Sequence, residues 1–135
     1  RELYGRTPAA IFLCNWYQMI GDLQGDVLKH RDDHAGEMET SFILSAAPHL
    51  VAKTPKGELI ADDGAVAKSR FDAVNRGWVS ITRPWHLLTS NSGSGYPHEA
   101  SAEKGEKIIA AAAERLGAFL TELSAATIDE RFPFA

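Results

Sequence analysis

The amino-acid sequence predicts an α/β fold in which a parallel or mixed β-sheet is flanked by helices. The apolar run at residues 10–17 has the length and aromatic content of a strand, and residues 78–82 alternate as a strand does. Residues 35–47 and 101–123 have the apolar spacing of helices. This alternation of strands and helices is typical of α/β proteins. Two strands are nevertheless few for a complete sheet.

The first run, AIFLCNWY, is predicted to be a buried strand that ends near Trp16. In open α/β sheets, ligands bind beyond the carboxyl ends of the strands, so Trp16 is a candidate site residue. Cys14 is the single cysteine and cannot form an internal disulfide. It is expected to be a small buried hydrophobic residue. Residues 21–33 are polar and are expected to form a loop with at most a helical turn.

The first predicted helix, over residues 35–47, ends where Pro48 interrupts it. Residues 54–70 are polar and rich in turn formers, so they are expected to lie on the surface. Residues 89–98, TSNSGSGYPH, predict a flexible glycine-rich loop. Ser101 then caps the second helix, whose apolar residues form one stripe: Ile108, Ala112, Leu116, Phe119 and Leu123.

The length, the net charge and the lengths of the apolar segments exclude several classes of protein. The 135 residues are enough for one domain with a core. The net charge is -4 and no stretch is strongly basic, so nucleic acid is not an expected partner. No apolar segment approaches the roughly 20 residues that span a bilayer. We therefore expect no membrane partner and a cytoplasmic location.

Residues 34–41, HAGEMETS, hold the candidate site. On a helix, Glu39 shares a face with Phe42 and Ile43, whereas Glu37 is expected on the polar side. A carboxylate on an apolar face needs a cationic partner, which could be an arginine, a lysine or a metal ion. His34 stands at the start of the same helix, and an imidazole beside a carboxylate can form a metal site or an acid–base pair. From spacing alone, helix capping and an internal salt bridge remain open.

The other histidines are weaker candidates for metal ligands or site residues. His30, His49 and His86 have no spacing that suggests ligation, and His49 is expected to cap a helix end. His98 and Glu99 could approach a pocket, although a solvated loop is the simpler interpretation. The NSGSG segment lacks the lysine and the strand–loop–helix setting of a phosphate-binding loop.

Two motifs resemble those of the creatininase (creatinine amidohydrolase) family. HAGEMETS followed by FILSAAPHLV resembles that family's HAG-x-x-ETS motif, which leads into a helix and then a proline. Downstream, GYPHEASAEKGEKI resembles the G-x-P-x-x-A-(S/T)-x-E-K-G segment that precedes the family's last helix. The motifs occur in the family's order, and the resemblance extends from the first predicted strand to the C-terminal helix.

The resemblance implies a metal-dependent hydrolase with a binuclear zinc or manganese centre, whose bridging water attacks a cyclic amide, lactam or formamide carbon. It implies that Glu39 is a metal ligand and His34 a catalytic proton shuttle. Trp16 and Tyr96 are expected to line the substrate pocket. Hydrolysis of a ring C–C bond in a cyclic keto-sugar of the inosose type is an alternative. A non-catalytic oligomerising subunit is another.

The family's other ligand motifs, an E-x-H pair, a following aspartate and an NGHGGN-type segment, do not occur in the sequence. Residues 1–135 are therefore expected to be the C-terminal part of a single creatininase-like domain. A second chain or segment would supply the N-terminal half, and complete units would form a homo-oligomer, typically a hexamer. Arg1 as first residue agrees with either a processed precursor or a partial chain. Alone, the chain is not expected to hold a binuclear centre.

Overall fold

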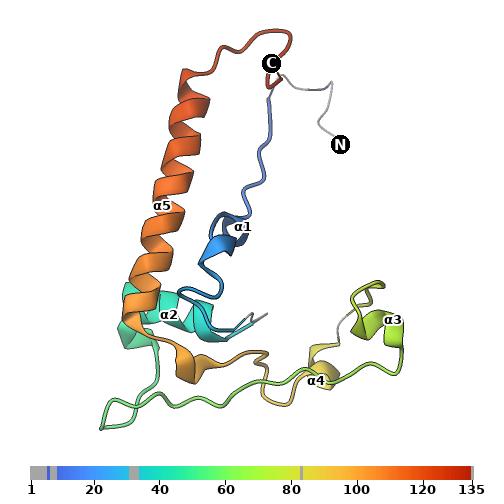
Figure 1. Ribbon diagram of the computed structural model, residues 1–135, viewed down its shortest axis with the longest axis vertical. Coiled ribbons are helices and arrows are strands. Elements are labelled where there is room, and N and C mark those ends of the chain that lie inside the picture. The colour runs from blue at the N-terminus through green and yellow to red at the C-terminus, as the bar shows by residue number, and fades with distance from the viewer. Residues whose placement is uncertain (1–5, 7–8, 31–33, 83, 135) are drawn as a thin grey trace.

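A computed structural model describes residues 6, 9–30, 34–82 and 84–134 (Figure 1). Two helices dominate it, and short helical turns lie in the connections between them. The elements in chain order are α1 (Trp16–Met19), the 3₁₀ turn η1 (Gly21–Leu23), α2 (Glu37–Ala46), η2 (Pro48–Leu50), α3 (Asp72–Asn75), α4 (Trp85–Leu88), η3 (Pro97–Glu99) and α5 (Ala102–Ala125).

Both predicted long helices are confirmed. Helix α2 begins after Gly36, and Pro48 follows its end. Helix α5 begins after Ser101, whose hydroxyl accepts the Lys104 N–H at 3.2 Å and so caps one of the free amides of the first turn. Of the predicted loop over residues 21–33, the described part, residues 21–30, contains one helical turn, as expected, and residues 31–33 lie outside the described residues.

The core is small and lies where α1 and α2 pack against the lower half of α5 (Figure 1). Ile20, Leu28 and Ile108 are buried at its centre. Further along α5, the predicted apolar stripe is only partly buried. Partly buried side chains complete the cluster: Trp16, Leu23, Met38, Ala111 and Ala112.

The predicted sheet is not confirmed. Within the described residues, β-structure is limited to isolated bridges, and residues 78–82 form no strand. Residues 9–15 run as an extended segment beside the upper part of α5 instead of forming a buried strand (Figure 1). Cys14 is exposed, so its predicted burial is wrong for this chain. A strand needs neighbours to be buried, and the described residues supply none at this position.

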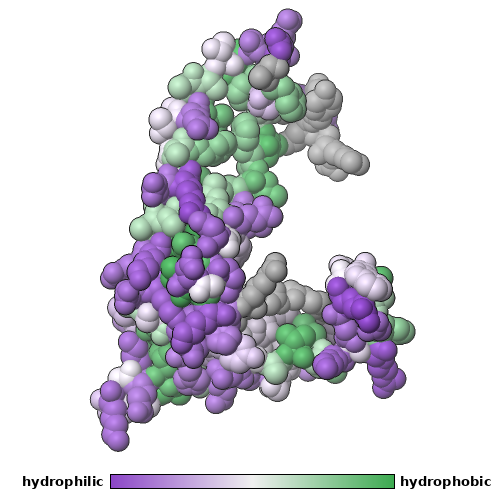
Figure 2. Space-filling model, in the orientation of Figure 1, coloured by the Kyte–Doolittle hydropathy of each residue, from purple (hydrophilic) through white to green (hydrophobic). Residues whose placement is uncertain are grey.

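The chain has an open shape. Its accessible surface is 10583 Å², whereas a closed monomer of its 14.7 kDa mass exposes roughly 6,900 Å². The segment between Gly64 and Gly93, here called the arm, carries α3 and α4 away from α5 (Figure 1). Apolar side chains are visible along residues 9–14 and near α4 (Figure 2). The large exposed apolar residues described in the arm are Val66, Phe71, Trp78, Val79, Ile81 and Leu87.

None of the helices in the described part of the chain is both long enough and apolar enough to cross a membrane.

Candidate functional site

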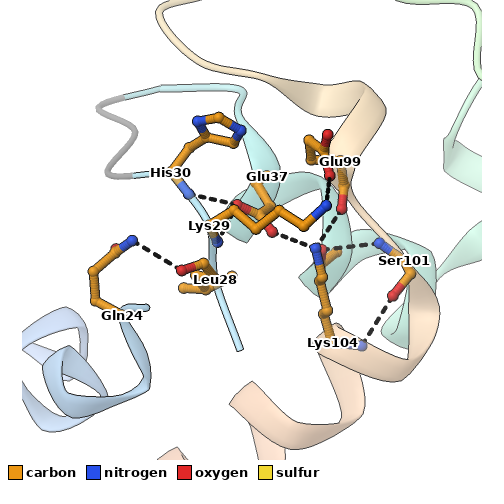
Figure 3. A network of polar contacts seen from close by, with 9 residues as sticks. Gln24, Leu28, Lys29, His30, Glu37, Glu99, Ser101 and Lys104 are labelled. Carbon is orange, nitrogen blue, oxygen red and sulfur yellow. Dashed lines mark hydrogen bonds and ion pairs between the residues drawn. The ribbon is translucent and has the colours of Figure 1, made fainter. Parts of the chain in front are cut away.

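The two sequence motifs meet in a partly buried polar network at the start of α2 and α5 (Figure 3). Glu37, the first residue of α2, is fully buried. One of its carboxylate oxygens, Oε2, accepts the backbone N–H groups of Lys29 and His30, each at 2.8 Å. The other, Oε1, forms an ion pair with Lys104 Nζ. Glu37 thus joins the loop before α2 to the first turn of α5.

The network extends to η3 and along α2. Lys104 Nζ also donates to the backbone oxygen of Glu99 at 2.7 Å, and the Glu99 carboxylate pairs with Lys29 Nζ at 2.6 Å. The hydrogen bond from Lys29 is the main reason that the pKa of Glu99 is lowered. One turn further along α2, the buried Ser41 hydroxyl accepts the Ser101 N–H at 3.1 Å. A continuous row of polar contacts therefore joins the two helices.

Gly105 allows the helices to approach closely at this point. A Cβ atom on Gly105 would lie 2.0 Å from the Ser41 backbone oxygen and 2.7 Å from Ser45 Cβ. Such distances are far below van der Waals contact. Gly105, the second glycine of the second motif, is therefore a packing requirement of the α2–α5 crossing.

The prediction that Glu39, and not Glu37, is the buried carboxylate of this helix is wrong. Glu37 is completely buried, whereas the side chain of Glu39 is 33% exposed. The reason is the chemistry of the neighbouring helix: α5 presents the Lys104 ammonium and the Ser101 N–H, so the polar side of α2 is the side that packs against it. The apolar spacing of α2 alone cannot show which side its neighbour covers.

Glu39 and His34 lie together in a cleft of about 570 Å³. Glu39 Oε2 accepts the Ala35 N–H at 2.7 Å and lies 3.4 Å from His34 Nδ1. Its other oxygen, Oε1, accepts the Tyr17 hydroxyl at 3.3 Å. Further lining residues are Thr40, Ile43, Leu50, Val51, Leu59, Ile60, Asp62, Asn91, Ser92 and Pro97, among others.

His34 is held from two sides. Its backbone oxygen accepts the Ser94 N–H at 2.9 Å in an isolated bridge, so the glycine-rich loop packs directly against it. Its ring meets the Trp85 ring edge-on, with 5.5 Å between centroids. This loop, which the sequence predicts to be flexible, is instead packed against the rest of the chain: Ser94, Gly95 and Pro97 are buried.

The phenol of Tyr17 faces the Glu39 carboxylate. Partial burial, together with the negative charge of Glu39 and the hydrogen bond to it, raises the pKa of Tyr17 above its usual value. Tyr17 therefore keeps its proton at neutral pH and remains a hydrogen-bond donor to Glu39.

Two loops cross at glycines to form one wall of the cleft. Gly64 N–H donates to the Gly95 backbone oxygen at 2.8 Å. A Cβ atom on Gly64 would lie only 2.2 Å from the backbone carbon of Gly93. His98 braces the same wall, because its Nε2 lies 2.7 Å from the backbone oxygen of Ala61.

Comparison with known proteins gives the family of this fold and site. The model of the family described as creatinine amidohydrolase (Creatininase) matches residues 1–120. The chain belongs to the creatininase family. It is also similar to the crystal structure of a protein from Bacteroides fragilis NCTC 9343 that carries a provisional assignment as a creatinine amidohydrolase. The TM-score is 0.80 and the sequence identity 28%. The match to that structure covers 96% of this chain, which spans about half, 49%, of the related chain. The comparison with curated proteins gave no match.

Of the residues that the family resemblance singled out, the cleft brings together His34 and Glu39 but not the two aromatic residues. Trp16 stacks on Tyr17 at 4.2 Å between centroids and packs on the core. Tyr96 packs on the His30 ring, also at 4.2 Å. Neither lines the cleft that holds His34 and Glu39, and their role in substrate binding stays a prediction.

Sequence reasoning did not single out Tyr17 and Trp85, which contact Glu39 and His34. For Tyr17 a signal was available, because it directly follows Trp16 at the end of the first apolar run. Trp85 lies 51 positions after His34, and no local spacing connects them.

His34 and Glu39 are residue types that bind the metal ions of a creatininase-type centre, but two ligands are fewer than such a centre needs. Imidazole nitrogen and carboxylate oxygen are both ligands of zinc and manganese. A catalytic zinc site uses three protein ligands, whereas the described residues contain no group of three or more potential histidine, cysteine, aspartate or glutamate ligands. His34 and Glu39 can therefore be only part of such a site.

Proposed function

We propose that this chain is one component of a metal-dependent hydrolase of the creatininase family that cleaves the C–N bond of a cyclic amide or formamide. The observation that supports the proposal is the His34–Glu39 pair, with 3.4 Å between Nδ1 and Oε2, in a cleft of a chain that belongs to this family. The cleft, about 570 Å³ in volume, has the size of a small-molecule site.

In this proposal His34 carries the proton. Its Nδ1 faces Glu39 Oε2, and a carboxylate in this position favours the tautomer with hydrogen on Nδ1. Nε2 is then the nitrogen that can take a proton from an attacking water and give it to the leaving nitrogen. Trp85 limits the rotation of the ring through its edge-on contact.

Glu39 would be this chain's ligand to a divalent ion, zinc or manganese, in a binuclear centre. When bound, such ions lower the pKa of a water and polarise the carbonyl that is attacked. The geometry also favours a second role for Glu39. Its Oε2 lies near His34 Nδ1 and accepts the Ala35 N–H, an arrangement that would orient the imidazole without contact to an ion.

A second polypeptide or segment that completes the α/β unit is part of the proposal. Two observations support it: the large exposed surface and the length of the related chain, of which this one spans 49%. We propose that complete units assemble as a homo-oligomer, with the hexamer as the form that the resemblance implies. A cytoplasmic location agrees with the single free cysteine.

The test is metal analysis together with a hydrolysis assay on the assembly isolated from its natural source. The assembly is incubated with a panel of cyclic amides that includes creatinine, and with formamides, and ring opening or amine release is followed. The expected result is bound zinc or manganese and turnover of at least one C–N substrate. If only an inosose-type keto-sugar is turned over, the reaction is hydrolysis of a ring C–C bond and not of a C–N bond. A metal-free assembly without turnover would indicate a non-catalytic subunit.

A further inference from the structure

We propose that Trp85 is a positioning residue for the reaction, and that the segment from Trp85 to Ser94 fixes both the ring and the backbone of His34. The inference deepens the proposed function and rests on it in one respect, since it takes His34 as the group that moves the proton. Trp85 acts through the imidazole of His34 and not through contact with the substrate.

The imidazole of His34 needs contacts to fix the plane of its ring. The outer side-chain torsion of a histidine is broad, so the backbone alone does not set this plane. Glu39 supplies one contact, because its Oε2 lies 3.4 Å from His34 Nδ1. The ring can still turn about the line that joins these two atoms. The Trp85 ring supplies a second contact, with 5.5 Å between centroids and an interplanar angle of 76°, the edge-on geometry that aromatic pairs prefer.

The indole of Trp85 is itself held at its polar edge. Its Nε1 donates to the backbone oxygen of Ser92 at 3.0 Å. The backbone oxygen of Trp85 accepts both the N–H and the hydroxyl of Thr89, at 3.0 and 3.1 Å. The side chain is therefore attached at both ends, to α4 through its backbone and to the following loop through Nε1. An indole that is fixed in this way can restrict the motion of a neighbouring ring.

The same segment also holds the backbone of His34. The Ser94 N–H donates to the His34 backbone oxygen at 2.9 Å. Asn91 stabilises the loop just before this point, because its Oδ1 accepts the Gly93 N–H at 3.0 Å and its Nδ2 donates to the backbone oxygen of Asp63 at 3.2 Å. One short segment thus contacts His34 at its ring and at its main chain.

Two residues beside the His34–Trp85 contact have a backbone conformation that is uncommon for residues with a Cβ atom. Ala35, which follows His34, has a φ of 53°, and Ser92, which accepts the indole N–H, has a φ of 66°. In the part of the chain that the structure describes, these are the non-glycine residues with positive φ. Such conformations cost free energy, persist where the surroundings enforce them, and cluster at functional sites. Both occur beside the residues that fix the imidazole.

Burial in the core does not explain the position of Trp85. Among the described residues, it neither belongs to the core cluster nor lines the cleft that holds His34 and Glu39. The other two tryptophans differ, since Trp16 packs on the core and Trp78 is 74% exposed. The contact that distinguishes Trp85 is the one with the His34 ring. The geometry therefore places its effect on the orientation of the imidazole.

The first experiment compares Trp85→Leu with Trp85→Phe in the complete assembly. Leucine keeps an apolar side chain on α4 but has no ring, whereas phenylalanine keeps an aromatic edge and loses the hydrogen bond to Ser92. A catalytic group misplaced by about 1 Å can cost on the order of 10²-fold in rate, so we expect kcat of Trp85→Leu to fall roughly 10–100-fold. KM and bound metal should be nearly unchanged. Trp85→Phe should recover most of the lost kcat.

Trp78→Leu is the matched control, since it removes an exposed indole from the same arm and should leave kcat and KM unchanged. An unchanged kcat in Trp85→Leu would overturn the proposal. Equal losses in the Leu and Phe variants would overturn it as well, because they would show that the aromatic edge is not what matters. A raised KM with normal kcat would assign Trp85 to substrate binding instead.

The second experiment is crystallographic and compares the wild-type assembly with Trp85→Leu. The wild type should show one orientation of the His34 ring, the edge-on contact and the bond from Nε1 to Ser92. Absence of these contacts would overturn the proposal even if the variant does not assemble. In Trp85→Leu the His34 ring should occupy more than one orientation while the Ser94 N–H still binds the His34 backbone. A single unchanged orientation would contradict the positioning role.

Ring orientation is measured without turnover, so the two proposals can fail separately. An assembly that cleaves no C–N bond refutes the proposed function, and the crystal structures still decide whether Trp85 fixes the His34 ring. Conversely, normal hydrolysis by Trp85→Leu refutes the positioning role and leaves the proposed function in place.

Discussion

The carboxylate of Glu37 and the ammonium of Lys104 form the ion pair that fixes the start of α2 against the start of α5. Glu37 comes from the first family motif and Lys104 from the second. The carboxylate is completely buried and the lysine side chain is 19% exposed. The two motifs therefore act in part as a structural joint, while His34 and Glu39 of the first motif lie in the cleft.

Replacing Lys104 tests this joint. Lys104→Met would remove the cationic partner of the buried Glu37 carboxylate, and breaking a buried pair in this way typically costs about 3–5 kcal/mol. We expect a clear fall in the free energy of unfolding of the purified assembly, measured by denaturant titration. Lys107→Met is the matched control, since the Lys107–Glu103 pair is exposed and should contribute less than about 1 kcal/mol. Equal effects of the two variants would show that the Glu37–Lys104 pair is not structurally important.

Two glycines of α5 provide a second matched pair. Gly105→Ala places a methyl group against the Ser41 backbone, so the helices must separate, and a loss of roughly 1–3 kcal/mol is expected. At Gly117 the added carbon would meet no described atom within 4 Å outside the backbone of its own helix, so Gly117→Ala should stabilise the protein by about 0.5–1 kcal/mol. Thermal unfolding of both variants checks this. A stable Gly105→Ala variant would contradict the close α2–α5 crossing.

Removing the imidazole of His34 tests its proposed catalytic role. In the complete assembly, His34→Ala should lower kcat by roughly 10²–10⁴-fold, the range for a lost general acid–base group, while bound metal is retained. His49→Ala is the control, because His49 is exposed and does not line the cleft. Steady-state kinetics and metal analysis of both variants are compared. Loss of the ions from His34→Ala would make His34 a ligand instead.

Glu39→Gln separates the two roles considered for this carboxylate. A metal ligand that loses its charge should release the ion and abolish turnover, and this is the expected result. The alternative, a carboxylate that only orients His34, predicts full metal content, a lower kcat and a displaced pH profile. Metal analysis beside a pH–rate profile distinguishes the two outcomes.

Acid stability depends on Asp22, which pairs with the Arg115 guanidinium of α5 at 2.5 and 2.7 Å. The hydrogen bonds from Arg115 are the main reason that the pKa of Asp22 is lowered. The pair therefore contributes stability above the unfolded pKa of about 3.9, and this contribution is lost as pH falls through the lower folded pKa. Asp22→Asn should reduce stability at neutral pH and flatten its dependence on pH below about 4. Unchanged dependence, measured by urea unfolding at several pH values, would contradict this.

The sequence predicted the two long helices well, because Ser101, Pro48 and the apolar spacing are local signals. It also predicted that His34 and Glu39 lie close together, because they are five positions apart at the start of one helix. The buried position of Glu37 was not predictable in this way. It depends on Lys104, 67 positions away, and helical spacing carries no information about a partner at that distance.

The strand prediction at residues 10–17 shows a different limit. Apolar and aromatic content predicted a buried strand here, yet residues 10–15 form no strand and Leu13 is 96% exposed. Burial depends on neighbours as well as on the segment itself, and a strand prediction contains no statement about whether those neighbours belong to the same chain.

The crossing at Gly64 and Gly93 has a consequence for how the arm can vary. The arm departs from the cleft wall and returns to it beside the same two glycines, and it is tied again by the Val66–Thr89 bridge and the Ala67–Leu88 backbone hydrogen bond at 2.8 Å. The two ends of the arm are thus held together, and its tip extends away from them. Insertions or deletions between residues 68 and 82 should therefore leave the wall of the cleft in place, whereas a side chain at Gly64, whose Cβ would lie 2.2 Å from the Gly93 backbone carbon, should deform it.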